Sequence, residues 1–253
     1  MDYHQTQAKV LSVAAEGGAY LVQLEAEEVA AAARPFQFVM VRVPGGGFPL
    51  RRPLSVFDAQ EGWLEVLIRP VGAGTTRLTS LSAGDRVDIT GPFGRAFEEP
   101  EGALYVAGGI GVAGVAYAVA AANRGGRRPR LFYGARSAHQ LAALARLQTL
   151  ADVTVVTDDG SDGEKGLVSD FVPGDARAVV ACGPRPMLAA LRARLSEGAA
   201  YYVVMEERMA CGLGVCRSCA VPAASGDGYL AVCDQGPVLA AADVDWQRLE
   251  MDV

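Results

Sequence analysis

Four of the five cysteines fall between positions 211 and 233 of this 253-residue chain, and they constrain its fold more than any other feature. Their spacing is C-x4-C-x2-C-x13-C, formed by Cys211, Cys216, Cys219 and Cys233. A disulfide framework spreads its cysteines over a small fold, whereas thiols gathered this tightly are typical of metal ligands. The C-terminal part of the chain is therefore expected to wrap a loop around a metal centre.

The first three cysteines match the ligand spacing of plant-type 2Fe–2S centres, with a fourth supplied later in the chain. Such a loop must bring backbone N–H groups close to the sulfurs, and the small residues Gly212, Gly214, Ser218 and Ala220 permit that approach. Structural zinc is the competing interpretation, although zinc sites usually use two close cysteine pairs. Cys182 lies outside the set and, taken alone, is typical of a buried, unreactive thiol.

Composition limits the classes of partner. The net charge is −6, and lysines and arginines form no block, which argues against a nucleic acid or an anionic membrane. The N-terminus lacks the pattern of a signal peptide, so a cytoplasmic location is expected. Residues 102–123 carry no charge, but their central glycines favour a strand, a turn and a buried helix over a membrane span.

The first third of the chain consists of short runs rich in Val, Leu and Phe, separated by turn signals. Six strands at this spacing predict an antiparallel β-barrel over residues 1–99. The expected strands are Lys9–Val13, Tyr20–Leu24, Phe38–Val43, Leu54–Phe57, Trp63–Arg69 and Arg86–Thr90.

Strands and helices alternate from residue 100 to 205, which predicts an α/β domain with a parallel sheet and helices on both faces. The expected strands are Leu104–Ala107, Leu131–Tyr133, Val153–Thr157, Ala178–Ala181 and Tyr201–Met205, and the expected helices reach Ala122 and cover Ser137–Leu150 and Pro186–Leu195. Residues 206–253 form the third expected domain, which carries the four cysteines. The predicted fold class is thus α+β with three domains.

Two segments of the expected barrel have the chemistry to bind a flavin dinucleotide. The first starts at the paired cations Arg51 and Arg52, whose planar forks suit a pyrophosphate, although solvated arginines at a strand entry are the plain alternative. In the second, a strand ends in glycines and hydroxyls, and the N–H groups of the following helix favour phosphate. The candidate contacts are Arg52, Pro53, Leu54, Ser55, Ile68, Arg69, Pro70, Gly74 and Thr75.

A glycine turn follows the first strand of the α/β domain. Gly109, Gly111 and Gly114 stand between a strand and a helix, as in dinucleotide-binding turns, although glycines used only for close packing give the same pattern. Cys182 and Gly183 end a later strand, and ligands of parallel sheets bind at that carboxyl edge. Gly109, Gly111 and Cys182 are therefore candidate contacts of a nicotinamide nucleotide.

With these features in this order, the chain resembles the ferredoxin–NADP reductase superfamily. The matching stretches are R-P-x-S at 52–55, G-x-G-T at 72–75, the glycines at 108–111 and C-G-P at 182–184. More narrowly, residues 205–216 and 232–238 are similar to the electron-transfer subunits of NAD-dependent (class 1B) dihydroorotate dehydrogenase.

The resemblance covers nearly the whole chain and implies FAD in the barrel, a 2Fe–2S cluster and NAD. It also implies a partner subunit that carries FMN and oxidises dihydroorotate in pyrimidine biosynthesis, in a heterotetramer with two of each subunit. Electrons would pass from the partner through the cluster and FAD to NAD+. Arg52 would neutralise the FAD pyrophosphate, Ser55 would contact the flavin near N5, Gly109 and Gly111 would admit the nucleotide, and Cys182 would lie near the nicotinamide.

Two other interpretations remain open. Related flavin and iron–sulfur subunits serve hydrogenases, sulfide dehydrogenases and NADH-dependent ferredoxin–NADP reductases, which would keep the cofactors and change the partner. A zinc-stabilised protein without redox function is the alternative from a different class. In either redox reading no residue has the features of an acid–base catalyst.

Overall fold

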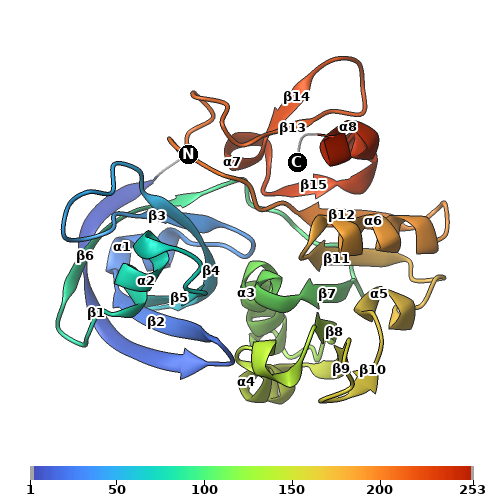
Figure 1. Cartoon of the computed structure of the whole chain (residues 1–253), viewed down its shortest axis with the longest axis horizontal. Coiled ribbons are helices and arrows are strands. Elements are labelled where there is room, and N and C mark those ends of the chain that lie inside the picture. Colours follow the sequence, from blue (N-terminus) through green and yellow to red (C-terminus); the bar gives the residue numbers. More distant parts are fainter. Residues whose placement is uncertain (1–2, 252–253) are drawn as a thin grey trace.

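The computed structural model describes residues 3–251, and residues 1, 2, 252 and 253 of the expected domain ranges lie outside the described residues. Its first unit is a closed antiparallel barrel with the strand order β1-β2-β5-β4-β3-β6, which confirms the predicted barrel (Figure 1). The strands are β1 (His4–Glu16), β2 (Ala19–Glu25), β3 (Phe38–Val41), β4 (Arg52–Gln60), β5 (Trp63–Ile68) and β6 (Arg86–Phe93). Two short helices, α1 (Glu27–Ala32) and α2 (Ala73–Thr79), join barrel strands.

The second unit is a seven-stranded sheet with the order β10-β9-β8-β7-β11-β12-β15. Its strands are β7 (Leu104–Gly108), β8 (Arg130–Ala135), β9 (Asp152–Thr157), β10 (Glu164–Lys165), β11 (Ala178–Cys182), β12 (Ala200–Val204) and β15 (Val238–Ala240). The chain adds strands on one side of β7 and then returns to add β11 and β12 on the other. The strand order therefore reverses between β7 and β11, the point at which ligands of such sheets bind.

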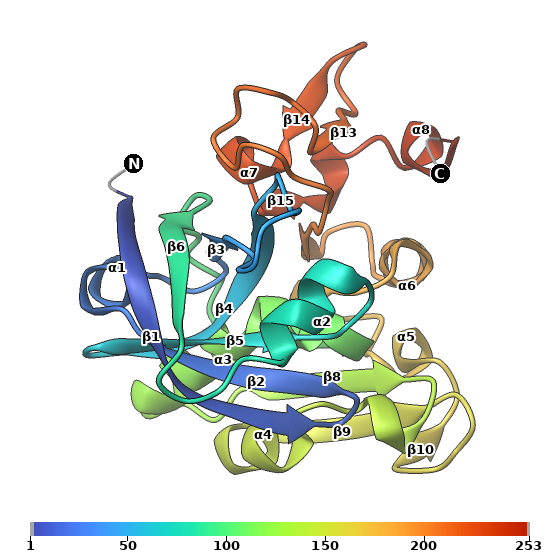
Figure 2. The same ribbon diagram turned by 60° about the vertical axis from the view of Figure 1, so that its left-hand side comes forward.

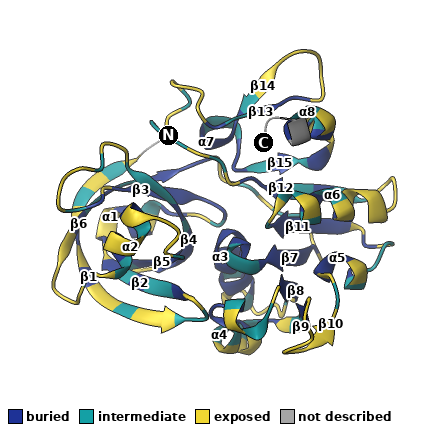
Figure 3. Ribbon diagram, in the orientation of Figure 1, coloured by how far each residue is buried: buried dark blue, intermediate teal, exposed yellow. Residues whose placement is uncertain are grey.

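Alternate residues of the sheet strands face opposite sides, as the period of two in a strand requires. Leu104 and Val106 pack with α5 (Val168–Phe171) and α6 (Arg185–Arg194), whereas Tyr105 and Ala107 pack with α3 (Val112–Arg124) and α4 (Leu144–Leu150). Figure 3 shows the central strands buried between these layers. The prediction of helices on both faces is confirmed.

The expected helix at 137–150 is wrong in its first half. A single 3-10 turn, η2 (Ala138–Gln140), comes first, and α4 begins only at Leu144. Ala143 lies between them with a φ of 54°, in the left-handed region that L-residues seldom adopt. This residue interrupts the helical backbone, although the side-chain pattern on both sides of it is helical.

Helix α3 packs against the sheet on one side and against the barrel on the other. The Tyr117 side chain joins the hydrophobic cluster of the barrel, and its hydroxyl donates a hydrogen bond to the Ala33 carbonyl at 3.2 Å. The rest of the helix is mostly Ala and Val, and these small side chains let both neighbours come close. The uncharged stretch at 102–123 is thus a strand, a 3-10 turn, η1 (Gly109–Gly111), and a buried helix.

The C-terminal segment lies across the same end of the barrel and the sheet in both views (Figures 1 and 2). It contains β13 (Ala220–Pro222), β14 (Tyr229–Ala231), α7 (Val232–Gln235), η3 (Ala241–Asp243) and α8 (Trp246–Met251). Its strand β15 pairs antiparallel with β12, with Val203 opposite Leu239. The expected all-parallel sheet is therefore a mixed one, because a strand from beyond residue 205 completes its edge.

The boundaries expected at residues 99 and 205 stay predictions. The last barrel strand ends at Phe93 and the next sheet strand begins at Leu104, while β12 ends at Val204. Within residues 3–251, no helix is long and apolar enough to cross a membrane.

A network of ion pairs joins the barrel to the helices beside it. The buried carboxylate of Asp58 on β4 accepts hydrogen bonds from Arg124 of α3 at 2.8 Å and from Arg146 of α4 at 2.9 Å. Arg146 also bonds Glu65 on β5 and lies over the Phe57 ring, 5.3 Å from its centroid. Burial raises the pKa of the Glu65 carboxyl, while its hydrogen bond to Arg146 lowers it. Asp58 is therefore the centre of the contact between the two units.

We expect Asp58→Ala to lower the free energy of unfolding by about 2 kcal/mol, because it leaves both arginines without their shared carboxylate. The loss is smaller than for a fully buried pair because the Arg124 and Arg146 side chains are 39% and 32% exposed. Urea unfolding measures it. The matched control is Asp152→Ala, which breaks the exposed Arg128–Asp152 pair and should cost less than about 0.5 kcal/mol. Equal losses in the two variants would contradict the assignment.

Candidate functional site

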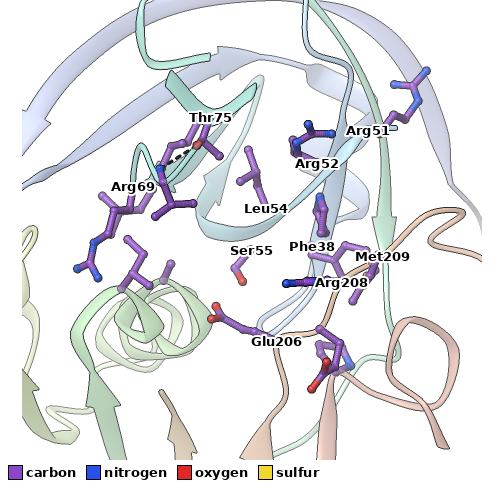
Figure 4. Close-up of a pocket in the computed structure, with 18 of the residues that line it drawn as sticks. Phe38, Arg51, Arg52, Leu54, Ser55, Arg69, Thr75, Glu206, Arg208 and Met209 are labelled. Carbon is purple, nitrogen blue, oxygen red and sulfur yellow. Dashed lines mark hydrogen bonds between the residues drawn. The ribbon is translucent and has the colours of Figure 1, made fainter. Parts of the chain in front are cut away.

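A cleft of about 740 Å³ opens between the barrel, the start of α3 and the segment that leads into the cysteine loop. Figure 4 shows its walls, with Arg52, Leu54 and Ser55 on the barrel side and Glu206 and Arg208 opposite. The lining residues are Phe38, Leu50, Arg51, Arg52, Pro53, Leu54, Ser55, Leu67, Ile68, Arg69, Val71, Thr75, Ile110, Ala113, Val204, Met205, Glu206, Glu207, Arg208, Met209 and Pro237. The cleft lies at the carboxyl edge of the sheet, beside the point where the strand order reverses.

The structure brings most of the candidate flavin contacts together in this cleft. The contacts that line it are Arg52, Pro53, Leu54, Ser55, Ile68, Arg69 and Thr75, whereas Pro70 and Gly74 do not. The candidate nucleotide contacts Gly109, Gly111 and Cys182 also lie outside the lining, although Ile110 and Ala113 beside them belong to it. The roles of all these residues in cofactor binding stay predictions.

Of the adjacent Arg51 and Arg52, only Arg52, the first residue of β4, has no ion-pair partner among the described residues. Arg51 forms an ion pair with Asp88 at 2.8 Å, so its charge is neutralised within the barrel. Arg52 donates to the Leu50 carbonyl and lies directly over Gly74, where an added Cβ would meet its Nη2 at 2.7 Å. Gly74 is therefore needed for the guanidinium to reach the start of α2, and any larger residue would displace it.

The Thr75 hydroxyl holds its own turn. Its oxygen accepts hydrogen bonds from the N–H groups of Val71 at 3.0 Å and Gly72 at 3.2 Å, and the hydroxyl donates to the Gly72 carbonyl. These bonds fix the loop between β5 and α2 that forms one wall of the cleft (Figure 4). The structure thus gives Thr75 a local role in addition to its place in the lining.

Arg69 is held at the other end of the cleft from Arg52. Its Nη2 is buried and has no hydrogen-bond partner among the described residues. Glu206 lines the same cleft, where its side chain is solvent-accessible but is surrounded on several sides by protein atoms. That desolvation raises the pKa of the Glu206 carboxyl, and the nearby charge of Arg69 opposes the rise.

The glycine turn and the end of β11 are in direct contact. A Cβ on Gly111 would meet the Cys182 carbonyl oxygen at 2.5 Å, and one on Gly114 would meet the Cys182 Sγ at 2.7 Å. A Cβ on Gly183 would come within 3.0 Å of the Gly108 backbone. The two loops that the sequence predicted at this edge therefore meet, and their glycines are required by packing whether or not a nucleotide binds.

Cys182 itself is fully enclosed. Its side chain has no exposed surface, and desolvation raises the pKa of the thiol well above its ordinary value, with a further rise from the charge of Glu206. The neutral thiol packs against Gly114, so a ligand at this edge would meet neighbouring backbone before it met the sulfur.

The four clustered cysteines form two pairs. The Cys219 and Cys233 sulfurs lie 3.3 Å apart in the interior, while Cys211 and Cys216 lie nearer the surface, and the Cys216 N–H donates to the Cys211 sulfur at 3.5 Å. Within residues 3–251, no three His, Cys, Asp or Glu side chains converge on a point where one metal ion could bind. Two thiolate pairs suit a centre of two irons, each of which takes two cysteines.

Backbone N–H groups point at the sulfurs, as the small residues of the loop suggest. Leu213 donates to Cys211 at 3.3 Å and Gly214 donates to Cys233 at 3.0 Å. Gly212 and Gly214 adopt φ values of 73° and 77°, which allow the chain to turn its amides inward. A loop that donates hydrogen bonds to its cysteines in this way stabilises them as thiolates.

Ser218 is a residue of the loop whose polar role sequence reasoning missed. Its Oγ accepts a hydrogen bond from the Ala210 N–H at 3.0 Å and lies 3.2 Å from the Cys216 sulfur, to which its hydroxyl can donate. This bond is the main reason that the pKa of Cys216 falls to about 6. Burial raises the pKa of Cys233 to about 12, so the Cys216 thiol ionises far more readily than that of Cys233.

Sequence reasoning also missed the wall opposite the barrel, which includes Glu206, Arg208 and Met209. Its position in the sequence could have indicated this wall, because the segment follows the carboxyl end of β12 and precedes Cys211. Pro237, from the segment that follows α7, joins the same wall. Both connections to the cysteine loop therefore form part of the cleft.

Comparisons with known proteins find a family model and relatives that all carry the name of dihydroorotate dehydrogenase B. A family model described as the iron-sulfur cluster binding domain of dihydroorotate dehydrogenase B matches residues 206–245. A protein of Geobacillus thermodenitrificans named "Dihydroorotate dehydrogenase B (NAD(+)), electron transfer subunit" is 39% identical over 240 residues, which cover 89% of this chain and 92% of that protein. A protein of the same name from Caldanaerobacter subterraneus is 36% identical over 218 residues, covering 83% and 86%.

Two solved structures show the same fold. A structure of the NADH-dependent reduced ferredoxin–NADP oxidoreductase superposes with a TM-score of 0.85 at 28% identity, covering 97% of this chain and 92% of that one. Phthalate dioxygenase reductase superposes with a TM-score of 0.64 at 18% identity, covering 95% and 96%, and this likeness concerns the fold alone.

We expect Gly111→Ala to lower the melting temperature by about 5 °C, because its Cβ would overlap the Cys182 carbonyl and force the glycine turn away from β11. Thermal unfolding measures the change. Gly198→Ala is the matched control, since no atom lies within 4 Å of the added carbon. A Gly111 variant as stable as the control would show that the contact between the two loops is loose.

Proposed function

This chain belongs to the family of dihydroorotate dehydrogenase B (NAD(+)) electron transfer subunits, and from that premise we propose that it carries electrons between a dihydroorotate-oxidising partner and NAD+. The protein is an oxidoreductase subunit of de novo pyrimidine biosynthesis, and its cofactors are FAD and a 2Fe–2S cluster. A cytoplasmic location is proposed with this function.

The observation that carries the proposal is the wall shared by the cleft and the cysteine loop. Glu206, Arg208 and Met209 line the cleft, and the chain reaches the first cysteine, Cys211, two residues after Met209. Pro237, two residues after the end of helix α7, which carries Cys233, lines the same wall. A flavin in the cleft and a cluster in the loop would therefore be separated by a single layer of protein, as electron transfer requires.

The residues of the cleft fit a flavin dinucleotide. Arg52 offers a guanidinium at the start of α2, where an anionic pyrophosphate would be stabilised. Phe38 and Leu54 give apolar surface for a ring system, and Ser55 provides a hydroxyl in the centre of the cleft (Figure 4). When bound, FAD would exchange a hydride with the nicotinamide and the cluster would carry single electrons. The chain itself would orient these groups and exclude water between them.

The cysteine loop fits a 2Fe–2S cluster. Its sulfurs form two pairs, and four backbone N–H groups donate to three of the sulfurs. Structural zinc, the alternative from another class, needs all four thiolates around one ion. Here the sulfurs group in space into an inner pair, Cys219 and Cys233, and an outer pair, Cys211 and Cys216, and this grouping supports two metal positions instead. Cys211, Cys216, Cys219 and Cys233 are proposed as the ligands.

The partner is a catalytic subunit of dihydroorotate dehydrogenase, and we propose that it carries FMN and assembles with this chain as a heterotetramer with two copies of each. Leu213 and Val215 in the cysteine loop are 42% and 81% exposed, and the adjacent Cys216 is exposed as well. Apolar side chains around the outer sulfurs would let a partner approach the cluster and exclude water from the contact.

A second candidate is the corresponding subunit of an NADH-dependent reduced ferredoxin–NADP oxidoreductase. It is supported by the superposition with that structure over nearly the whole chain. The cofactor sites would be the same, so only the partner distinguishes the two functions. Hydrogenase and sulfide dehydrogenase subunits have no observation here in their favour.

Reconstitution with the FMN-containing dihydroorotate-oxidising subunit of the same organism tests the function. We expect the complex to form NADH from dihydroorotate and NAD+, whereas neither subunit alone does so. Cys216→Ser should reduce this rate at least tenfold, because it removes one cluster ligand. Ser225→Ala, an exposed serine in the same part of the chain, is the control and should leave the rate unchanged.

Two results would contradict the proposal. A complex that contains FAD and iron but forms no NADH from dihydroorotate, while a ferredoxin-dependent partner is reduced, would favour the second candidate. A colourless protein that contains zinc and releases no flavin on acid extraction would favour the non-redox alternative.

A further prediction concerns Ser218. We expect Ser218→Ala to lower the midpoint potential of the cluster, because the hydroxyl bond to Cys216 stabilises the more negative, reduced state. Redox titration followed by electron paramagnetic resonance measures the potential, and Ser218→Thr, which keeps the hydroxyl, should restore it. An unchanged potential in the alanine variant, with full iron content, would mean that the hydroxyl does not contact the ligand sulfur in the loaded protein.

A further inference from the structure

Arg185 is a cation at a position where the helix dipole disfavours positive charge. It is the first residue of α6 and directly follows Pro184, in the turn after the carboxyl end of β11. The first turn of α6 contains no acidic residue. Because the N-terminus of a helix carries partial positive charge, it repels a guanidinium placed there. The contacts that stabilise Arg185 therefore come from outside α6.

Two hydrogen bonds supply that stabilisation, and both acceptors belong to the C-terminal segment. Nη2 of Arg185 donates to a carboxylate oxygen of Glu207 at 2.6 Å, and Nη1 donates to the Leu249 carbonyl at 3.0 Å. Glu207 lies between β12 and the first cysteine, whereas Leu249 lies in α8, which Figures 1 and 2 show beside α6. One guanidinium therefore joins the turn after β11 to both ends of the segment that carries the cysteines.

Glu207 belongs to the wall of the cleft, four residues before Cys211, whereas Arg185 does not line the cleft. The neighbouring lining residues Glu206 and Arg208 form no ion pair with the described residues, so the Arg185–Glu207 pair is the one fixed ion pair of this part of the wall. The two side chains are 31% and 15% exposed, which limits the screening of their charges by water. Arg185 thus neutralises, from outside the cleft, a carboxylate of its wall.

We propose that Arg185 is a positioning residue that acts through Glu207, by neutralising the negative charge that the wall between flavin and cluster would otherwise present to the flavin. This inference rests on the proposed function. Reduction of the flavin by two electrons, with uptake of one proton, leaves its ring system with one negative charge. An unpaired carboxylate nearby disfavours that state and lowers the midpoint potential. The ion pair therefore keeps the flavin easier to reduce by electrons from the cluster.

A purely structural role of the pair predicts a different result from a role in charge. If the pair only held the wall in place, removing either partner would loosen the same contact, and the flavin potential would move in the same direction in both variants. If charge is decisive, the two directions are opposite. Loss of Arg185 leaves a negative charge beside the cleft, whereas loss of Glu207 leaves a positive one.

The test is a spectroelectrochemical titration of the flavin in protein loaded with FAD and cluster, at pH 8, where carboxylates are ionised. We expect Arg185→Gln to lower the ratio of reduced to oxidised flavin at a fixed potential about threefold, which is about 15 mV for a two-electron couple. Glu207→Gln should raise the ratio, and the double variant should lie between the two. Arg128→Gln, which breaks the exposed pair with Asp152 outside the cleft, is the matched control and should leave it unchanged.

A second measurement separates the charge of Arg185 from its contact with α8. Arg185→Lys keeps the charge but loses the planar fork that reaches two acceptors at once. We expect its flavin potential to equal that of the unmodified protein, while amide hydrogen exchange in α8 becomes faster because the Leu249 carbonyl loses its donor. Mass spectrometry measures the exchange and does not depend on electron transfer.

Potentials that move in the same direction in Arg185→Gln and Glu207→Gln would overturn the inference, as would an unchanged potential in Arg185→Gln with full FAD content. If Arg185→Gln does not fold, Glu207→Gln decides, since a potential that is unchanged or lower in that variant contradicts the inference. Opposite shifts in a protein that forms no NADH from dihydroorotate with its partner would contradict the proposed function alone. An active complex without the opposite shifts would contradict only the role of Arg185.

Discussion

Helix α3 is the element on which the rest of the structure depends, because both halves of the protein pack against it. Its small side chains and the glycines before it let the sheet approach on one side and the barrel on the other. Asp58 then fixes the angle of approach through one arginine of α3 and one of α4. The cleft lies beyond the packing of the barrel on α3 and the ion pairs of Asp58. Its shape therefore depends on contacts between residues that do not line it.

The cysteine loop is built on the same principle of close backbone approach. Glycines with positive φ turn amides toward sulfur, and the two pairs differ sharply in burial. The inner pair is enclosed by apolar residues of the core, whereas the outer pair faces solvent. The outer pair is therefore the side of the loop that a partner protein can reach.

Local patterns in the sequence predicted those parts of the fold that local patterns determine. Short runs rich in Val, Leu and Phe between turn signals predicted the barrel strands, and the cysteine spacing predicted the loop. Strand β15 was missed because three residues, Val238–Ala240, carry no pattern, and their pairing with β12 is a tertiary event. The break at Ala143 was missed because its cause is backbone conformation. Residues 52–55 line the cleft as a group, because they are neighbours on one strand. The contact of Arg69 with Gly109 depends instead on how the barrel packs against the sheet, which sequence patterns do not encode.

Strand β15 has a consequence for solubility. An open sheet edge offers unpaired N–H and C=O groups to any passing strand, and β12, with the run Tyr201–Val204, would be such an edge. The opposite edge is a strand of only two residues, Glu164–Lys165, which is too short and too charged to recruit another chain. Strand β15, which belongs to the segment that holds the cysteines, pairs with β12 and so prevents β12 from pairing with a strand of another molecule. A variant truncated before residue 238 would leave the edge of β12 unpaired and would be prone to aggregate.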